Sequence, residues 1–125
     1  MSYRIMIVDD SKLARMSVSR ALMKLRPNWE LAEAASTGDA LALAKKHPVD
    51  IALVDFNMPG PDGLVLAAEL RAIDARMPIA IVSANHQSEI VAKSNEIGAR
   101  FLGKPLTEDA LSEFLKAAEA NLERR

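Results

Sequence analysis

The 125-residue chain has the length of one ordinary domain, and half of its residues are hydrophobic, enough to bury a core. Its 16 Lys and Arg against 17 Asp and Glu give a net charge of -1, which does not favour general attraction to nucleic acid or membrane surfaces. The lack of cysteine excludes disulfides, thiolate metal sites and thiol catalysis. The first residues form neither a signal peptide nor a membrane span, so we expect a soluble, cytoplasmic protein.

Short apolar runs alternate with stretches in which apolar residues recur every 3.6 positions. The runs are rich in β-branched residues and do not alternate with polar ones, which is typical of strands buried on both faces. In chain order, the expected elements are a strand over 5–8, a helix over 14–25, a weaker strand over 29–34, a helix over 37–46, a strand over 51–54, a helix over 66–73, a strand over 79–82, a helix over 88–97, a weaker strand over 100–102 and a helix over 111–122.

Several residues mark the expected helix boundaries. Ser11 and Thr37 are predicted N-caps, Asp62 is predicted to form a turn that starts a helix, and Thr107 precedes acids that suit a helix N-terminus. Gly98 is a predicted C-cap. The stripe that ends at Ile73 is expected to face the core.

This strand–helix order predicts one α/β domain over 1–125. Five strand–helix units favour a doubly wound, five-stranded parallel sheet with right-handed crossovers and helices on both faces. The sequence contains no linker, repeat or low-complexity tract, and we expect no output domain.

Polar residues follow four of the five expected strands. Because ligands of open α/β sheets bind beyond the carboxyl ends of the strands, these residues form the candidate site. They are Asp9, Asp10, Asp55, Asn57, Ser83 and Lys104.

Converging carboxylates repel one another unless a cation joins them, and Mg²⁺ prefers oxygen ligands. A lysine and a hydroxyl complete the parts needed for phosphoryl transfer. Asp55, isolated at a strand end, is the best candidate nucleophile, while the neighbours Asp9 and Asp10 are a candidate metal pair.

Plainer interpretations exist for each residue. The Asp9–Asp10 pair could be a solvated turn before a helix, Ser83 a helix cap, and Phe101 an ordinary core aromatic. Lys104 stands where a nucleotide-binding loop, G-x-x-x-x-G-K-[ST], has its lysine. Pro105, however, replaces the required hydroxyl residue, and the preceding segment is strand-like.

With these residues in this order, the sequence resembles the response-regulator receiver domains of two-component signalling, and it is similar to the stand-alone chemotaxis-type regulators among them. The resemblance covers roughly residues 3–122. Its motifs are IVDDS (7–11), LVDFNMPGPDG (53–63), IVSAN (81–85) and FLGKP (101–105), each at a strand end. It implies a flavodoxin-like strand order, 2-1-3-4-5.

The resemblance also implies a role for each site residue. Asp55 would accept the phosphoryl group, and Asp9, Asp10, Asp55 and the backbone carbonyl of Asn57 would hold Mg²⁺. Ser83 and Lys104 would bind phosphoryl oxygens, and Ser83 would act with Phe101 as a switch. The Lys104–Pro105 bond would be cis, and Asn57 and Asn85 would tune the access of water to the phosphoaspartate.

The implied function is a phosphorylation switch and not an enzyme beyond self-phosphorylation and autodephosphorylation. A histidine kinase or a histidine phosphotransfer protein would donate the phosphoryl group, and a protein target would be bound in trans by the fourth helix, fifth strand and fifth helix. We expect a monomer without direct nucleic-acid binding or membrane insertion.

Three alternative functions fit the sequence less well. A haloacid-dehalogenase-type phosphatase needs a second acid where Asn57 stands, and a flavodoxin-like FMN site needs a neutral loop where Asp9 and Asp10 stand. A domain that keeps only the fold for protein interaction would not need the full set of site residues.

Overall fold

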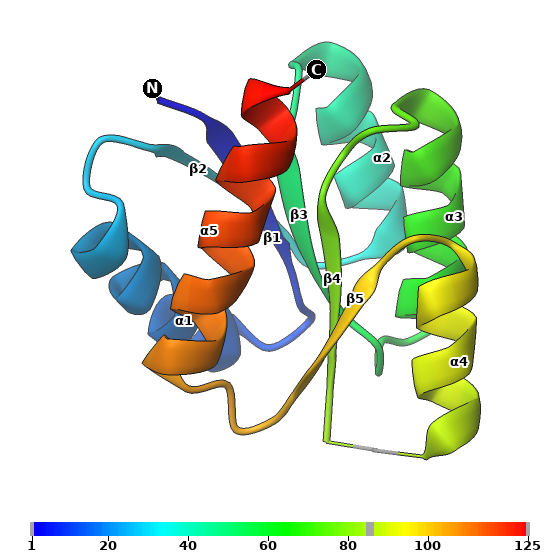
Figure 1. Ribbon diagram of the computed structural model, residues 1–125. Coiled ribbons are helices and arrows are strands. Elements are labelled where there is room, and N and C mark those ends of the chain that lie inside the picture. Colours follow the sequence, from blue (N-terminus) through cyan, green and yellow to red (C-terminus); the bar gives the residue numbers. More distant parts are fainter. Residues whose placement is uncertain (1, 85–86, 125) are drawn as a thin grey trace.

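The computed structural model describes residues 2–84 and 87–124. Strands and helices alternate along the whole chain (Figure 1). The elements are β1 (Arg4–Val8), α1 (Lys12–Leu25), β2 (Glu30–Ala34), α2 (Thr37–Lys46), β3 (Ile51–Asp55), α3 (Gly63–Ile73), β4 (Ile79–Ser83), α4 (Ser88–Glu96), β5 (Arg100–Gly103) and α5 (Glu108–Glu123).

The five strands form one parallel sheet in the order β2-β1-β3-β4-β5. Figure 1 shows α1 and α5 on one side of this sheet and α2, α3 and α4 on the other. The predicted (βα)₅ architecture and its strand order are therefore confirmed. No helix within the described residues is long and apolar enough to cross a membrane.

The sheet separates two hydrophobic cores, and each buried strand contributes to both. In β1, Ile5 and Ile7 pack into the core beneath α1 and α5, whereas Met6 and Val8 pack into the opposite one. Successive side chains of a strand point to opposite faces, so a strand covered on both sides must be apolar throughout. This explains the unbroken apolar runs of the sequence.

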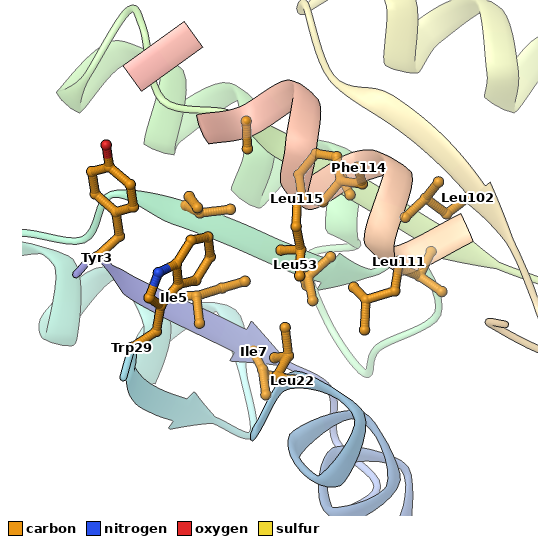
Figure 2. Packing of buried hydrophobic residues seen from close by; sticks show 14 of the residues in the cluster. Tyr3, Ile5, Ile7, Leu22, Trp29, Leu53, Leu102, Leu111, Phe114 and Leu115 are labelled. Carbon is orange, nitrogen blue, oxygen red and sulfur yellow. The ribbon is translucent and has the colours of Figure 1, made fainter. Parts of the chain in front are cut away.

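Aromatic side chains lie in the core beneath α1 and α5, at the end away from the candidate site. Figure 2 shows Tyr3 and Trp29 beside each other, with Ile5 next to them. The two rings meet edge to face with 5.4 Å between their centroids. The guanidinium of Arg26 lies 5.6 Å from the Trp29 ring, close enough for a cation–π contact.

Most of the predicted helix boundaries are confirmed. Ser11, Asp62 and Thr107 cap α1, α3 and α5 by accepting hydrogen bonds from backbone N–H groups in the first turns. Gly98 follows α4 with a φ of 70°, a conformation in which glycine avoids the steric penalty of a side chain.

The predicted N-cap at Thr37 is wrong by one residue. Ser36 caps α2, because its hydroxyl accepts a hydrogen bond from the N–H of Asp39 at 3.1 Å. Thr37 is the first helical residue, and its hydroxyl donates instead to the carbonyl of Pro61 at 3.0 Å. This bond ties the start of α2 to the loop that follows β3.

The expectation that Ile73 faces the core is also wrong. Leu66 and Leu70 of the same stripe are fully buried, but Ile73, the last residue of α3, is 47% exposed. Met77 returns from the connection to β4 and is 2% exposed within the same core. Because α3 ends at Ile73 with Asp74 as its C-cap, the connection to β4, and not a further turn of the helix, supplies this core side chain.

Candidate functional site

Four strands deliver the candidate residues to one edge of the sheet. Asp9 follows β1, Asp55 ends β3, Ser83 ends β4 and Lys104 follows β5. The parallel register pairs Val8 with Val54, Asp55 with Val82, and Ser83 with Gly103, so all four strands end at a similar level. Side chains from distant parts of the sequence therefore meet above the carboxyl ends of the strands.

Asp9, Asp10 and Asp55 form what we call the acidic cluster. Each contributes a carboxylate oxygen, and these oxygens lie within 4.8 Å of one another. Asp9 and Asp55 are 7% and 5% exposed, whereas Asp10 is open to solvent. Three carboxylates this close repel one another strongly in a partly dry environment.

Asp55 is the most unusual acid of the cluster. Burial raises its pKa, and the neighbouring Asp9 raises it further, while Lys104 and a backbone hydrogen bond from Asn57 act in the opposite direction. Its Oδ1 is buried and lies 3.0 Å from Lys104 Nζ, but no donor among the described residues is aligned to form a hydrogen bond with it. The contact is a close ion pair, and it leaves Oδ1 with no second protein ligand among the described residues.

Lys104 supplies positive charge opposite the acidic cluster. Its Nζ also lies 3.7 Å from Asp9 Oδ2. Burial alone lowers the pKa of Lys104, but Asp55 and Asp9 together outweigh this effect, and the pKa is raised. The Lys104–Pro105 bond is cis, and the backbone N–H of Lys104 donates to the carbonyl of Ser83 at 2.9 Å.

The remaining predicted residues lie around this centre. Ser83 is fully buried at the end of β4, and Asn57 is exposed in the loop after β3. Phe101 is half-buried on β5, where it pairs with Ile81. Asn85 and His86 lie outside the described residues. The roles that the resemblance gives to these side chains stay predictions.

The loop after β3 returns tightly to the strand at Gly63. The N–H of Gly63 donates to the carbonyl of Phe56 at 3.1 Å, and a Cβ at this position would lie only 2.5 Å from the backbone oxygen of Asp55. A side chain would therefore push against the residue that carries the candidate nucleophile. The sequence shows Gly63 only as a turn residue, because this contact depends on the path of the loop.

Arg15 also contacts the site, although the sequence gives no direct sign of it. Its Nη1 donates to the backbone carbonyl of Asp9 at 2.6 Å. Its Nε pairs with a carboxylate oxygen of Glu33, on β2, at 3.0 Å. An arginine five residues after an acidic pair is a weak signal, because a helix surface carries many arginines.

The donor set fits a hard divalent cation. Carboxylate oxygens of the acidic cluster lie close enough to share one ion, and the buried Asp55 Oδ1 lacks an aligned donor. Mg²⁺ binds oxygen ligands and usually keeps several waters, which suits a site that is open on the Asp10 side. A cation there would also offset the repulsion among the three acids.

Comparisons with known proteins point to one family. Residues 5–116 match the response regulator receiver domain. The chain is 35% identical over 117 residues to chemotaxis protein CheY of Bacillus subtilis, a match that covers 92% of this chain and 96% of that protein. Its fold is similar to the structure of CheY4 of Vibrio cholerae, with a TM-score of 0.85, 27% identity, and coverage of 94% of this chain and 99% of that one.

Longer proteins match as well. The chain is 34% identical over 114 residues to the probable transcriptional regulatory protein NarL of Mycobacterium tuberculosis, and the match covers 91% of this chain but 52% of that protein. The chain thus spans about half the length of such a relative. Together with the sheet order and the residues gathered at its edge, the match over most of the sequence shows that this chain belongs to the response regulator receiver domain family.

Proposed function

We propose that Asp55 accepts a phosphoryl group in a Mg²⁺-dependent reaction and that this modification switches a partner-binding surface. The observation that carries the proposal is the position of Asp55. It is a buried carboxylate at the end of β3, between two further acids and the ammonium of Lys104. This arrangement supports in-line transfer to a carboxylate oxygen.

Asp9, Asp10, Asp55 and the backbone carbonyl of Asn57 would hold the ion. When bound, Mg²⁺ supplies positive charge for the equatorial phosphoryl oxygens and for the acids themselves. The donor set of the acidic cluster supports this assignment, as does the buried Oδ1 of Asp55, whose one close partner is the ammonium of Lys104.

The donor in our proposal is a phosphohistidine of a histidine kinase or of a histidine phosphotransfer protein. A carboxylate oxygen of Asp55 attacks phosphorus while the P–N bond breaks, and the bonding electron pair leaves with the imidazole nitrogen. Lys104 then binds a phosphoryl oxygen through its ammonium, and Ser83 binds another through its hydroxyl. The raised pKa of Lys104 supports a charged ammonium in this role.

The output of the switch would be a change of surface. Ser83 would move toward the phosphoryl group and vacate space for Phe101, which biases two pre-existing states of the domain. The surface formed by α4, β5 and α5 would then bind a protein target in trans. In this proposal the domain acts as a cytoplasmic monomer and catalyses only its own phosphorylation and dephosphorylation.

The test is the intact mass of the protein after incubation with acetyl phosphate, with and without Mg²⁺. We expect one phosphoryl adduct that requires both Mg²⁺ and Asp55. Asp55→Ala should abolish it, and Asp109→Asn, which alters an exposed acid of α5, should leave it unchanged. An adduct that persists in Asp55→Ala or forms equally without Mg²⁺ would contradict the proposal. A wild-type protein that gains no adduct from this donor or from a phosphorylated histidine protein would favour a domain that only binds partners.

A further inference from the structure

Arg15 connects the acidic cluster to a neighbouring strand. It lies in the first turn of α1 and is only 15% exposed as a side chain. One end of its guanidinium donates to the carbonyl of Asp9 at 2.6 Å, and Nε pairs with Glu33 on β2 at 3.0 Å. A planar guanidinium donates to two such acceptors from separate nitrogens held at a fixed angle, whereas a lysine ammonium has its donors on one nitrogen and no such rigid fork.

The position of this cation is unfavourable for the helix itself. Helix N-termini carry partial positive charge and favour acids, but the first turn of α1 contains no acidic residue and ends with Arg15. Helix stability therefore does not explain an arginine here. Its two hydrogen bonds, which reach away from α1, offer a better explanation.

Three hydrogen bonds fix Asp9 in place. Its backbone N–H donates to Ala34 at 3.1 Å, its Oδ1 accepts from the N–H of Ser11 at 2.9 Å, and its carbonyl accepts from Arg15. Of these three, only the bond from Arg15 comes from a side chain. The residue before the exposed Asp10 is thus held partly by a group that a single substitution can remove.

We propose that Arg15 is a positioning residue for the metal site, which holds the segment of Asp9 and Asp10 so that their carboxylates meet Asp55. The inference rests on the proposed function, because it concerns the affinity of the acidic cluster for Mg²⁺. Outer-shell partners of metal ligands typically alter affinity by about 10–100-fold when they are removed. Arg15 differs from such partners in one respect: it acts on the main chain of the ligand and not on its carboxylate.

The direction of the change in Mg²⁺ affinity distinguishes a positioning role of Arg15 from a purely electrostatic one. Arg15 is a cation near a cation site, so the loss of its charge alone would tighten Mg²⁺ binding. The loss of its hydrogen bond to Asp9 would weaken the binding. The exposed Lys12 of the same helical turn provides the matched control, since Lys12→Gln removes the same charge.

The experiment is isothermal titration of the metal-free full chain with MgCl₂ for the wild type, Arg15→Gln, Arg15→Lys, Glu33→Gln and Lys12→Gln. We expect Arg15→Gln to weaken Mg²⁺ binding about 10-fold. Arg15→Lys and Glu33→Gln should lie between this variant and the wild type, and Lys12→Gln should match the wild type or bind slightly more tightly. Urea unfolding in EDTA, run in parallel, measures any loss of stability that does not involve the ion.

Each outcome has a defined meaning. Unchanged or tighter binding in Arg15→Gln overturns the positioning role, as does an equal loss in Lys12→Gln. If Arg15→Gln does not fold, Arg15→Lys decides the question, because it keeps the positive charge and alters only the geometry of the hydrogen bonds. A wild type that does not bind Mg²⁺ overturns the inference together with the metal-dependent part of the proposed function, whereas normal wild-type binding with an unaffected Arg15→Gln overturns the inference alone.

Discussion

At the scale of single residues, Gly63 controls how closely the loop after β3 approaches the candidate nucleophile. A Cβ at this position would lie 2.5 Å from the backbone oxygen of Asp55 and 2.9 Å from Cα of Phe56. Both are main-chain atoms that cannot move without displacing the strand end. A methyl group at position 63 therefore disturbs stability and site geometry together.

We predict that Gly63→Ala lowers the free energy of unfolding by about 1–3 kcal/mol, the usual cost of overpacking. Phosphorylation from acetyl phosphate should slow in the same variant. Gly38→Ala is the matched control, because the first contact of a new Cβ there is at 4.0 Å and the residue lies in α2. It should stabilise the protein by about 0.5–1 kcal/mol. Urea denaturation measures both changes, and equal effects of the two substitutions would contradict the assignment.

The burial of Asp55 predicts how the stability of the domain depends on pH. Folding raises the pKa of this group above its ordinary value of 3.8, chiefly through burial. The folded state then binds the proton more tightly than the unfolded state, so this group favours the folded state below its unfolded pKa. This stabilising contribution of Asp55 is lost as the pH rises from the pKa of the unfolded state through the raised pKa of the folded state.

Asp55→Asn should accordingly be more stable than the wild type at neutral pH in metal-free buffer, by about 1 kcal/mol or more. Lys104 keeps Asp9 as a partner in this variant, so no lone buried cation is created. The difference should shrink as the pH falls toward 3.8. Chemical denaturation across this pH range measures the effect, and a variant less stable than the wild type at neutral pH would show that the Asp55–Lys104 pair is net stabilising.

At the scale of elements, Arg71 connects three segments at the end of the sheet opposite the candidate site. Its Nη1 donates to the carbonyls of Ala75 and Met77, beyond α3. Its Nε and Nη2 donate to the carbonyls of Ile97 and Gly98, before β5. A single side chain of α3 thereby satisfies carbonyls in two separate connections, the one between α3 and β4 and the one between α4 and β5.

We predict that Arg71→Lys lowers the free energy of unfolding by about 2–4 kcal/mol. A lysine ammonium cannot reach all four carbonyls, and hydrogen bonds from charged donors contribute about 1.5–3 kcal/mol each. Arg76→Lys, at an exposed position in the same connection, should change stability by less than about 0.5 kcal/mol. Similar urea midpoints for the two variants would show that the carbonyls are satisfied equally well by water.

The features of the fold and site that the sequence predicts are those with a local signal, such as an apolar run or a polar residue at a strand end. The strands β1, β3 and β4 are buried along their length and stand out as apolar runs, whereas the edge strands β2 and β5 are partly exposed and give weak signals. The acids and Lys104 were recognisable because they directly follow strands. The contacts of Thr37 with Pro61 and of Arg15 with Asp9 depend on how distant segments pack, and periodicity carries no information about them.

At the scale of the whole molecule, the proposed binding of a cation at the acidic cluster would link the stability of the domain to divalent cations. An ion that binds the folded state and not the unfolded chain stabilises the fold by mass action, by about 2.7 kcal/mol at 100 times the dissociation constant. The cluster draws Asp9 and Asp10 from the loop between β1 and α1 and Asp55 from the end of β3, so the unfolded chain cannot reproduce it.

We therefore predict that MgCl₂ raises the thermal unfolding midpoint of the wild type, and that Asp10→Asn abolishes most of this gain. NaCl at matched ionic strength controls for screening of the same charges. Differential scanning calorimetry measures the shift. Equal stabilisation by NaCl, or an undiminished gain in Asp10→Asn, would contradict a specific ion site.

The place of β1 inside the sheet bears on how the domain is made. The strand β1 pairs with β2 on one side and with β3 on the other, and β3 begins only at Ile51, so β1 is synthesised well before its second partner. Until that segment has been synthesised, one backbone edge of β1 and the apolar side chains beneath it have no partner. Asp9 and Asp55 come together only when the two strands pair, so the capacity to bind a cation would mark the moment at which the nascent chain has closed the centre of its sheet.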